Sequence, residues 1–443
     1  MNEVATATPP TRWDMLPPSR RRQLLGRAMV ALVRETPPDR SDLDPLVQGD
    51  PARELAALAT YHRLPGLVSR RLEGLGVRSE LTEQLAAAHH DAAAHAFGLL
   101  AELVGMAERL SERQIPWMLV KGLALGQLAY GDHGLRNTLD LDLVVPPSAF
   151  PAALEAVESA GGAPRQQNWP LLARLRLGQI VVRLPLGAYG DLHWHLVNTP
   201  EARARFHVPM AELFERRRPV DLGPLAVDTL DPVDTVLHLC VHGALSGGHL
   251  LVWLKDVERS VHAGTTAPGW AWDVLVTRAR RYGLGLVTAV MLQRARVVLA
   301  TEVPADVVDA LAPKSPLVAF WSTFDRAGTR HWGTETGTGK TLLGATASST
   351  GSTLVTLARR VQEDVVAPRT RDTVSRLPGV RIANRPRIAN RPRLTDERGG
   401  KVERRRYLDT VAAEAWQSGS WVGTTGGAGR SGTMDTSGET DPG

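Results

Sequence analysis

The segment "NTLDLDLVV" (residues 137–145) decides the fold class, because its pattern predicts a buried strand that carries acidic side chains. Successive side chains on a strand point to opposite faces, so Asp140 and Asp142 are predicted to share one face. The other face would carry Leu139, Leu141 and Leu143. A Pro-Pro pair follows directly and ends the strand. The segment therefore predicts one strand of a sheet with two carboxylates on one side.

Two carboxylates side by side on a buried strand repel each other and lose hydration. A divalent cation relieves both costs, and hard oxygen ligands of this kind suit Mg²⁺. In proteins Mg²⁺ usually completes its coordination with substrate phosphates. The alternative is an edge strand whose Asp-x-Asp pair is solvated and binds nothing.

The segment "IPWMLVKG" (residues 115–122) predicts a short buried strand, and a helix follows it. Gly122 would let the backbone approach a phosphate, and the first turn of the helix offers free N–H groups. Lys121 would add a point charge for a triphosphate. Its alternative role is that of a lysine at the end of a strand.

The segment "YGDLHWHL" (residues 189–196) predicts another strand, on which Asp191, His193 and His195 share a face. Asp191 would supply a third carboxylate, as two-metal phosphoryl chemistry requires. Two alternatives stay open for this face. It could be merely solvated, or the three side chains could form the site of a metal-dependent hydrolase.

The spacing of apolar residues and the composition outside the strands divide the chain into five predicted parts. Apolar residues recur at helical spacing before and after the strands, and Gly, Ser, Thr and Arg dominate the end of the chain. The predicted parts are a flexible N-terminus (1–20), an N-terminal helical region (21–112), an α/β core (113–200), a C-terminal helical region (201–330), and a mostly disordered tail that is first basic and then rich in Gly, Ser and Thr (331–443).

Composition excludes several classes of protein. The 443 residues are 43% hydrophobic and 22% charged, as in an ordinary globular protein, and no apolar run is long enough to predict a membrane span. Cys240 is the single cysteine, so an intramolecular disulfide is impossible and a cytoplasmic location is expected. The N-terminus lacks the features of a signal peptide. The net charge of +5 derives from residues 359–406, with 15 Lys and Arg against 6 Asp and Glu, so nucleic acid is not an expected partner of the folded body.

The order of these motifs resembles the nucleotidyltransferases of the DNA polymerase β superfamily. More narrowly, it is similar to the bacterial group labelled uncharacterised nucleotidyltransferase family, some members of which occur in peptide natural-product clusters such as those of lasso peptides. Flanking segments contribute to the resemblance, which covers about residues 50–325. They are "LAALATYHRLPGL" (55–67), "LDPVDTVLHLCVHGA" (230–244) and "LVWLKDVERSV" (251–261).

This resemblance implies a mixed-sheet core and the transfer of a nucleoside monophosphate (NMP) from an NTP to a hydroxyl or amine, with release of pyrophosphate. Asp140 and Asp142 resemble the paired metal carboxylates, which hold Mg²⁺. Asp191 resembles the third acid, which binds metal or helps to activate the acceptor hydroxyl. The acceptor could be a small molecule, a peptide or a protein.

The resemblance also implies phosphate contacts. Gly122 resembles the glycine of the phosphate loop, Lys121 the lysine before it, and Arg136 an arginine that precedes the acidic strand. The chain departs from the wider superfamily at the loop, because Leu123 stands where Ser or Gly is usual and the gap to Asp140 is longer. This departure favours an alternative in which the chain is a catalytically weak or inactive nucleotide- or partner-binding member of the same fold.

Two further motifs have simpler interpretations. "TETGTGKT" (334–341) is close to the phosphate loop of an ATPase and would use Lys340, but threonine stands where the first glycine is required. His238 and His242 have the i, i+4 spacing of a zinc-binding pair, yet no acidic third ligand matches that pair and the predicted helix is apolar. We therefore expect no ATPase site at Lys340, and we expect the histidines to pack within a helix.

Overall fold

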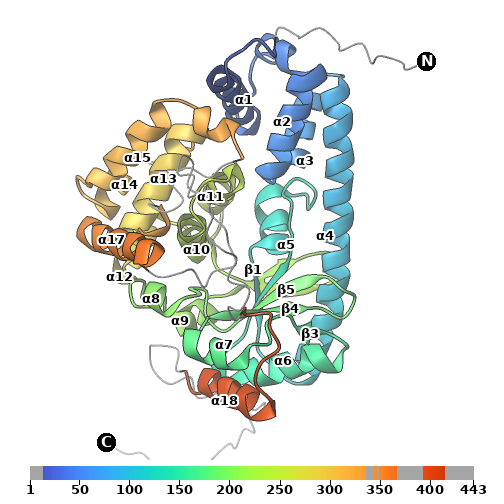
Figure 1. The fold of residues 1–443 in the computed structure, drawn as a ribbon, viewed down its shortest axis with the longest axis vertical. Coiled ribbons are helices and arrows are strands. Elements are labelled where there is room, and N and C mark those ends of the chain that lie inside the picture. The colour runs from blue at the N-terminus through green and yellow to red at the C-terminus, as the bar shows by residue number, and fades with distance from the viewer. Residues whose placement is uncertain (1–12, 336–342, 347–348, 367–392, 415–443) are drawn as a thin grey trace, which may run out of the picture.

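The computed structural model describes residues 13–335, 343–346, 349–366 and 393–414. It contains a five-stranded sheet at one end of the molecule and a larger helical body at the other (Figure 1). The predicted α/β fold class with a mixed sheet is confirmed. The predicted boundaries between the parts of the chain stay a prediction.

The sheet has the strand order β1-β2-β5-β4-β3. β2 and β5 lie next to each other and run parallel, and the other neighbouring pairs are antiparallel. The strands are β1 (Met118–Val120), β2 (Leu141–Val144), β3 (Ala163–Pro164), β4 (Gln179–Arg183) and β5 (Tyr189–His193). The helices among them are α5 (Gly122–Leu125), the π-helical turn Gly126–Tyr130, the 3-10 turn Pro147–Ala149, α6 (Phe150–Ser159) and α7 (Trp169–Leu175).

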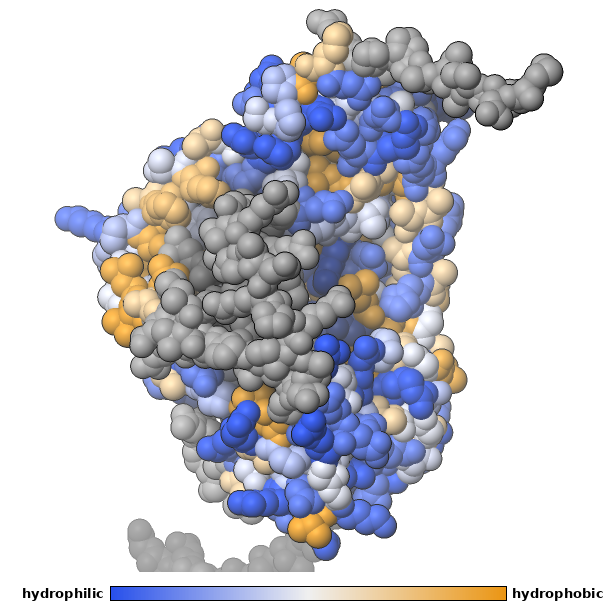
Figure 2. All heavy atoms as spheres, in the orientation of Figure 1, coloured by the Kyte–Doolittle hydropathy of each residue, from blue (hydrophilic) through white to orange (hydrophobic). Residues whose placement is uncertain are grey.

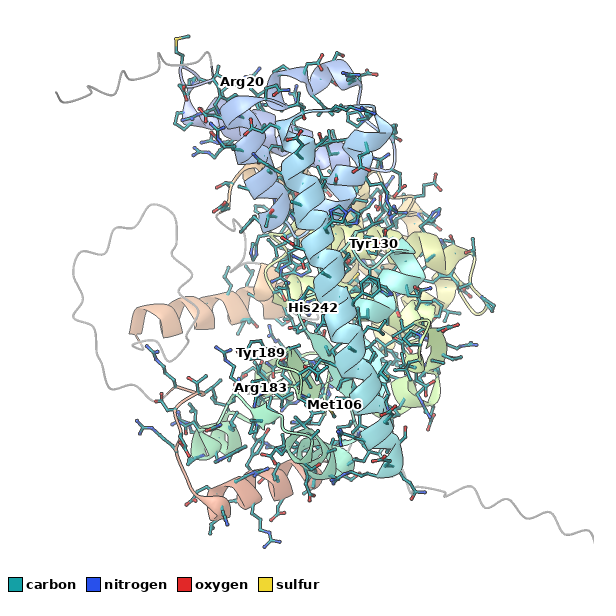
Figure 3. The ribbon with its side chains drawn as sticks, turned by 90° about the vertical axis from the view of Figure 1, so that its right-hand side faces the viewer. Arg20, Met106, Tyr130, Arg183, Tyr189 and His242 are labelled. Atoms are coloured by element: carbon teal, nitrogen blue, oxygen red, sulfur yellow. The ribbon has the colours of Figure 1, made fainter. Side chains whose placement is uncertain are left out.

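The N-terminal helices lead into the sheet through one long helix, α4 (Glu80–Glu112). Ser79 caps its first turn, and its 33 residues give a length of about 50 Å. α4 contacts α2 and α3 at one end and α6 beside the sheet at the other, so it spans both halves of the molecule (Figures 1 and 3). The other N-terminal elements are α1 (Pro18–Val33), α2 (Gly49–Tyr61), α3 (Pro65–Gly74) and the 3-10 turns Arg40–Asp42 and Asp44–Leu46.

The region after the sheet is helical except for one hairpin, β6 (Arg218–Asp221) and β7 (Ala226–Thr229), which the sequence analysis did not predict. Its first helices are α8 (Pro200–Arg203), α9 (Met210–Glu215), α10 (Pro232–Leu245) and α11 (Leu251–Thr265). They are followed by α12 (Trp272–Arg281), α13 (Gly285–Leu299), α14 (Ala305–Leu311), α15 (Pro316–Arg326) and the 3-10 turn Arg330–Gly333.

The described part of the segment predicted as a mostly disordered tail includes the helices α17 (Thr350–Val366) and α18 (Lys401–Ala412), which the prediction did not contain. α18 packs on the core domain through Tyr407, which is buried and meets the Phe150 ring edge-on. Its apolar side chains are few, so helical periodicity alone is a weak signal there.

Buried side chains form two large cores. One joins the N-terminal helices to α10, α11 and α13, so the two helical regions form one packed body. The other lies between the sheet and α4, α6, α7 and α18. The opposite face of the sheet has only a small apolar cluster, and this face also carries the acidic residues.

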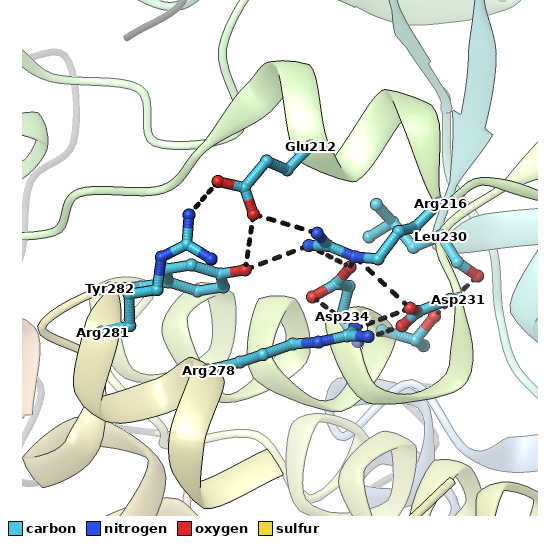
Figure 4. A network of polar contacts seen from close by, with 9 residues as sticks. Glu212, Arg216, Leu230, Asp231, Asp234, Arg278, Arg281 and Tyr282 are labelled. Carbon is cyan, nitrogen blue, oxygen red and sulfur yellow. Dashed lines mark hydrogen bonds and ion pairs between the residues drawn. The ribbon is translucent and has the colours of Figure 1, made fainter. Parts of the chain in front are cut away.

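A charged network fixes α9, α10 and α12 to one another (Figure 4). Arg216 and Arg278 both contact Asp234, at 2.9 and 3.2 Å, and Arg278 also lies 2.6 Å from Asp231. Glu212 accepts hydrogen bonds from Arg216 at 3.0 Å and from Arg281. Each carboxylate in this network is therefore paired with at least one arginine.

Among the described residues, no helix is both long and apolar enough to cross a membrane. Figure 2 shows one face of the molecule as mostly hydrophilic. This face is hollowed near its centre, where Figure 1 draws α5.

Candidate active site

The parallel pairing of β2 with β5 brings two of the predicted carboxylates together. Asp142 and Asp191 are direct cross-strand partners. Leu141, Leu143 and Leu192 on the same strands are buried in the large core beneath the sheet. Because side chains alternate along a strand, both carboxylates lie on the opposite face.

His193, two residues after Asp191, joins these carboxylates. Its Nε2–H donates a hydrogen bond to Asp142 Oδ1 at 3.0 Å. Potential metal-ligand atoms of Asp142, Asp191 and His193 all lie within 4.8 Å of one another. No other such group of three occurs in the described part of the chain. Carboxylate oxygens suit Mg²⁺ and Mn²⁺, and imidazole nitrogen is a common ligand of transition metals. These three side chains therefore fit a divalent cation.

Asp140 lies beside this group but is not part of it. β2 begins at Leu141, so the predicted strand does not extend back to residues 139 and 140, and Leu139 is 44% exposed. The reason is that the pairing of β2 with β5 starts at Leu141, and no ladder holds the residues before it. Burial and the nearby charge of Asp142 raise the pKa of Asp140.

The turn between β1 and α5 holds a strained lysine. Lys121 has φ 58° and ψ −143°, a backbone conformation that residues other than glycine rarely adopt. The next residue, Gly122, has φ 40°. Lys121 Nζ lies 2.9 Å from Asp142 Oδ1. Burial raises the pKa of Asp142, but Lys121 and His193 outweigh it and hold that pKa well below its usual range. The predicted contacts of Lys121 and Gly122 with phosphate stay predictions.

Arg136, predicted as a phosphate contact, forms a buried bidentate ion pair with Asp256 of α11. Its Nε and Nη2 donate to the two carboxylate oxygens at 2.8 and 3.0 Å. The hydroxyl of Tyr130 donates to the same carboxylate at 2.8 Å. Burial opposes the charge of Arg136, yet Asp256 raises its pKa. In the structure Arg136 thus ties the loop before β2 to the helical body.

Asp191 forms no ion pair with an arginine or lysine in the described ranges. It accepts a hydrogen bond from Gln179 Nε2 on β4, which orients one of its oxygens. Burial, supported by the negative charges of Asp142 and Asp140, raises the pKa of Asp191 to about 6. This carboxylate therefore lacks the compensating cation that Asp142 has in Lys121.

One turn of α10 faces this acidic surface from the helical body. His238 and His242 lie side by side on it with ring centroids 6.0 Å apart, and the charges of Lys121 and Asp142 reach both. Burial lowers the pKa of His238 to about 3 and that of His242 well below its ordinary value. Neither histidine belongs to a metal-binding group among the described residues, and their packing role stays a prediction.

The sequence analysis missed Arg63, which lies in the turn between α2 and α3. It has φ 61° and is partly buried. The charges of Arg136, Asp140 and Asp256 act electrostatically on its guanidinium. The only sequence signal is an arginine just before "LPGL" in an otherwise apolar stretch. Nothing local to the sequence connects this turn with the acidic strands.

The ATPase-like motif cannot be placed, because Lys340 and Thr341 lie outside the described residues. Gly333, just before the motif, packs tightly on α1, where an added Cβ would lie 1.8 Å from the Arg22 carbonyl oxygen. The described residues that lead into the motif therefore belong to the helical core.

A mixed sheet that presents neighbouring carboxylates to a helical wall is the arrangement expected for a nucleotidyltransferase. The sequence pattern of the family described as "Uncharacterised nucleotidyltransferase" matches residues 49–300, more than half of the chain. The protein belongs to this family. The match includes every predicted site residue as well as Arg63, His193 and Asp256. No functionally curated protein matches the chain.

Proposed function

We propose that the protein is a metal-dependent nucleotidyltransferase that moves an NMP from an NTP to a hydroxyl or amine of an acceptor. The observation that carries this proposal is the pairing of Asp142 with Asp191 across β2 and β5, with His193 beside them. The family match over the same residues supports it. Asp140, in the bend before β2, is proposed as a further acid of the same site.

Asp142, Asp191 and His193 would hold the cation, and Mg²⁺ is the proposed ion. When bound, such a cation neutralises negative charge on the α-phosphate and orients it. The acceptor oxygen or nitrogen forms a bond to the α-phosphorus while the bond to the bridging oxygen breaks, and pyrophosphate leaves with that electron pair. Asp191 is proposed either as a ligand or as the group that takes the acceptor proton. Lys121, Gly122 and Arg136 are proposed to contact the phosphates.

A second candidate function is nucleotide binding without transfer. It is favoured by Lys121, whose ammonium already neutralises Asp142 at 2.9 Å. An internal cation in this place competes with a metal ion for the same carboxylate. Leu123, which lacks the hydroxyl of the usual phosphate loop, favours the same alternative.

The test is incubation with each α-labelled NTP and Mg²⁺ or Mn²⁺, with and without candidate small-molecule, peptide and protein acceptors. The proposal expects label transfer that is lost in Asp140→Asn and Asp142→Asn and retained in Lys340→Ala. Binding of NTP without any transfer would favour the binding module. Loss of activity only in Lys340→Ala would favour an ATPase.

A further inference from the structure

Arg63 is held in place by a turn whose backbone is fixed on both sides. His62, immediately before it, is fully buried, and its Nδ1 accepts a hydrogen bond from the Leu251 N–H at 3.2 Å. Its other nitrogen, Nε2, therefore carries the proton and donates to the Trp332 carbonyl oxygen at 2.8 Å. His62 thus links the α2–α3 turn to both α11 and the turn before residue 334.

The same turn is tied to the loop that precedes the acidic strand. The Arg63 carbonyl oxygen accepts a hydrogen bond from the Asn137 N–H at 3.3 Å. Gly66, in the first turn of α3, approaches this loop so closely that a Cβ would lie 2.2 Å from the Gly134 carbonyl oxygen. The backbone around Arg63 is therefore clamped to the loop that leads to Asp140.

The guanidinium of Arg63 has no partner of its own in the part of the chain that the structure describes. Among the described residues it forms no hydrogen bond and no ion pair, although it is partly buried and lies near Asp140. Asp256, the other nearby carboxylate, already forms the bidentate pair with Arg136. Burial and the like charge of Arg136 lower the pKa of Arg63, and the attraction of Asp140 and Asp256 does not offset them.

Such an arginine destabilises the fold. Its backbone is in the left-handed region, which disfavours residues other than Gly, Asn and Asp, and the attraction of Asp140 and Asp256 does not offset the partial desolvation of its charge. Residues that cost stability in this way are common where a ligand supplies the missing interaction. The planar guanidinium matches the oxygens of phosphate in a bidentate manner.

We infer that Arg63 binds the β- and γ-phosphates of the NTP, so that the helical body supplies a substrate-binding residue to the site on the sheet. This inference rests on the proposed function for the identity of the nucleotide. The cation binds at Asp142, Asp191 and His193. Arg63 pairs with the negative charge that the cation does not neutralise on the polyphosphate and on the pyrophosphate product. Nucleotide binding then joins the two halves of the molecule.

The test compares Arg63→Gly and Arg63→Asn with the wild-type chain, by titration with inorganic tripolyphosphate and with NTP, both in Mg²⁺. Glycine and asparagine tolerate the left-handed backbone, so both variants should unfold at the same temperature as the wild type or higher. Their affinity for tripolyphosphate should fall about 10- to 100-fold, the usual effect of losing hydrogen bonds to a charged group. Arg70→Ala is the matched control, since Arg70 lies on α3 and pairs with Asp132 at the surface.

Three results overturn the inference. Unchanged tripolyphosphate affinity in both variants would show that Arg63 is not a phosphate ligand, even if the wild type transfers NMP normally. A large drop in unfolding temperature would show that its role is structural. A wild-type chain that binds neither tripolyphosphate nor NTP would overturn both this inference and the proposed function. Weakened tripolyphosphate binding would support the Arg63 site even if no acceptor receives NMP.

Discussion

Two acidic clusters lie near α10, and they differ in how their charges are compensated. In the network of Figure 4, Asp231, Asp234 and Glu212 all contact arginines. At the sheet, Asp142 pairs with Lys121, while Asp140 and Asp191 form no ion pair within the described ranges.

The pKa values do not distinguish these clusters. Burial raises the pKa of Asp191 to about 6, and burial also raises that of Asp234 to about 6. What differs is the compensation, because Arg216 and Arg278 both pair with Asp234, whereas no arginine of the described ranges pairs with Asp191. The comparison teaches that a raised pKa marks burial, whereas an absent partner marks a place for a ligand.

The largest expected effect is on catalysis, at the acidic cluster on the sheet, where Asp191 forms no ion pair within the described ranges. Asp191→Asn should lower NMP transfer by about 10³-fold or more, because the lost charge acts on the reacting phosphate. The rate of label transfer from an α-labelled NTP measures this. Asp228→Asn, which changes a surface aspartate paired with Arg217, is the control and should transfer normally. Normal transfer by Asp191→Asn would remove this residue from the site.

In the arginine-paired network of Figure 4, the expected effect of a substitution is on the stability of the fold rather than on catalysis. Asp234→Asn removes the carboxylate that Arg216 and Arg278 share and should lower the free energy of unfolding by about 2–3 kcal/mol, because each arginine keeps a second carboxylate partner. Urea denaturation measures this, and the same Asp228→Asn control should change it by less than about 1 kcal/mol. Transfer measured well below the unfolding temperature should persist. Loss of NMP transfer in Asp234→Asn, with the protein still folded, would show that the charged network of Figure 4 is part of the active site.

Acid should weaken the hydrogen bonds by which His62 holds the α2–α3 turn to α11 and to the turn that contains Trp332. Burial, with the charges of His249 and His331, lowers the pKa of His62 to about 4 from an unfolded value near 6.5. A lowered pKa means that the stabilisation is complete above pH 6.5 and is lost as the pH falls from 6.5 towards 4. The loss assigned to His62 is about 3 kcal/mol.

This loss can be isolated by comparing variants. His62→Gln should be less stable at pH 7.5 and should lose less stability than the wild type between pH 6.5 and 4. His90→Gln, at an exposed position of α4, should follow the wild-type curve. Equal pH dependence in wild type and His62→Gln would contradict the assignment.

The smallest effect concerns the strained turn beside Asp142. Gly122→Ala places a Cβ 3.2 Å from Thr138 Cγ2 at φ 40° and should cost about 1 kcal/mol of stability. Gly98→Ala, at an open position of α4 with ordinary helical φ, should gain about 1 kcal/mol. Thermal unfolding compares the two. A stabilising Gly122→Ala would show that the turn has room for a side chain.

Local sequence patterns predicted the central strands, although β2 begins at Leu141 and leaves Asp140 outside it. The alternation in "LDLDLVV" and the motif "GDLHW" identified β2 and β5, and these strands bring Asp142 and Asp191 together. The short hairpin and α18 escaped prediction, because their stability depends on packing against distant elements rather than on their own periodicity.

Long-range partners at the site could not be predicted in the same way. Arg136 pairs with Asp256, which lies 120 residues later in the sequence, and Arg63 reaches the acidic loop from a separate helical turn. His193 was noted on the face of Asp191, but its hydrogen bond to Asp142 depends on the strand order. Such contacts depend on topology, which one sequence does not reveal.

The most direct test of this account is the rise in unfolding temperature caused by Mg²⁺ and NTP in the wild type, Asp191→Asn and Asp234→Asn. Binding to the folded state alone raises that temperature. Asp234→Asn should start lower than the wild type and rise by a similar amount. Asp191→Asn should start at least as high as the wild type and should not rise. The account would be contradicted if Asp191→Asn were destabilised and still rose as the wild type does.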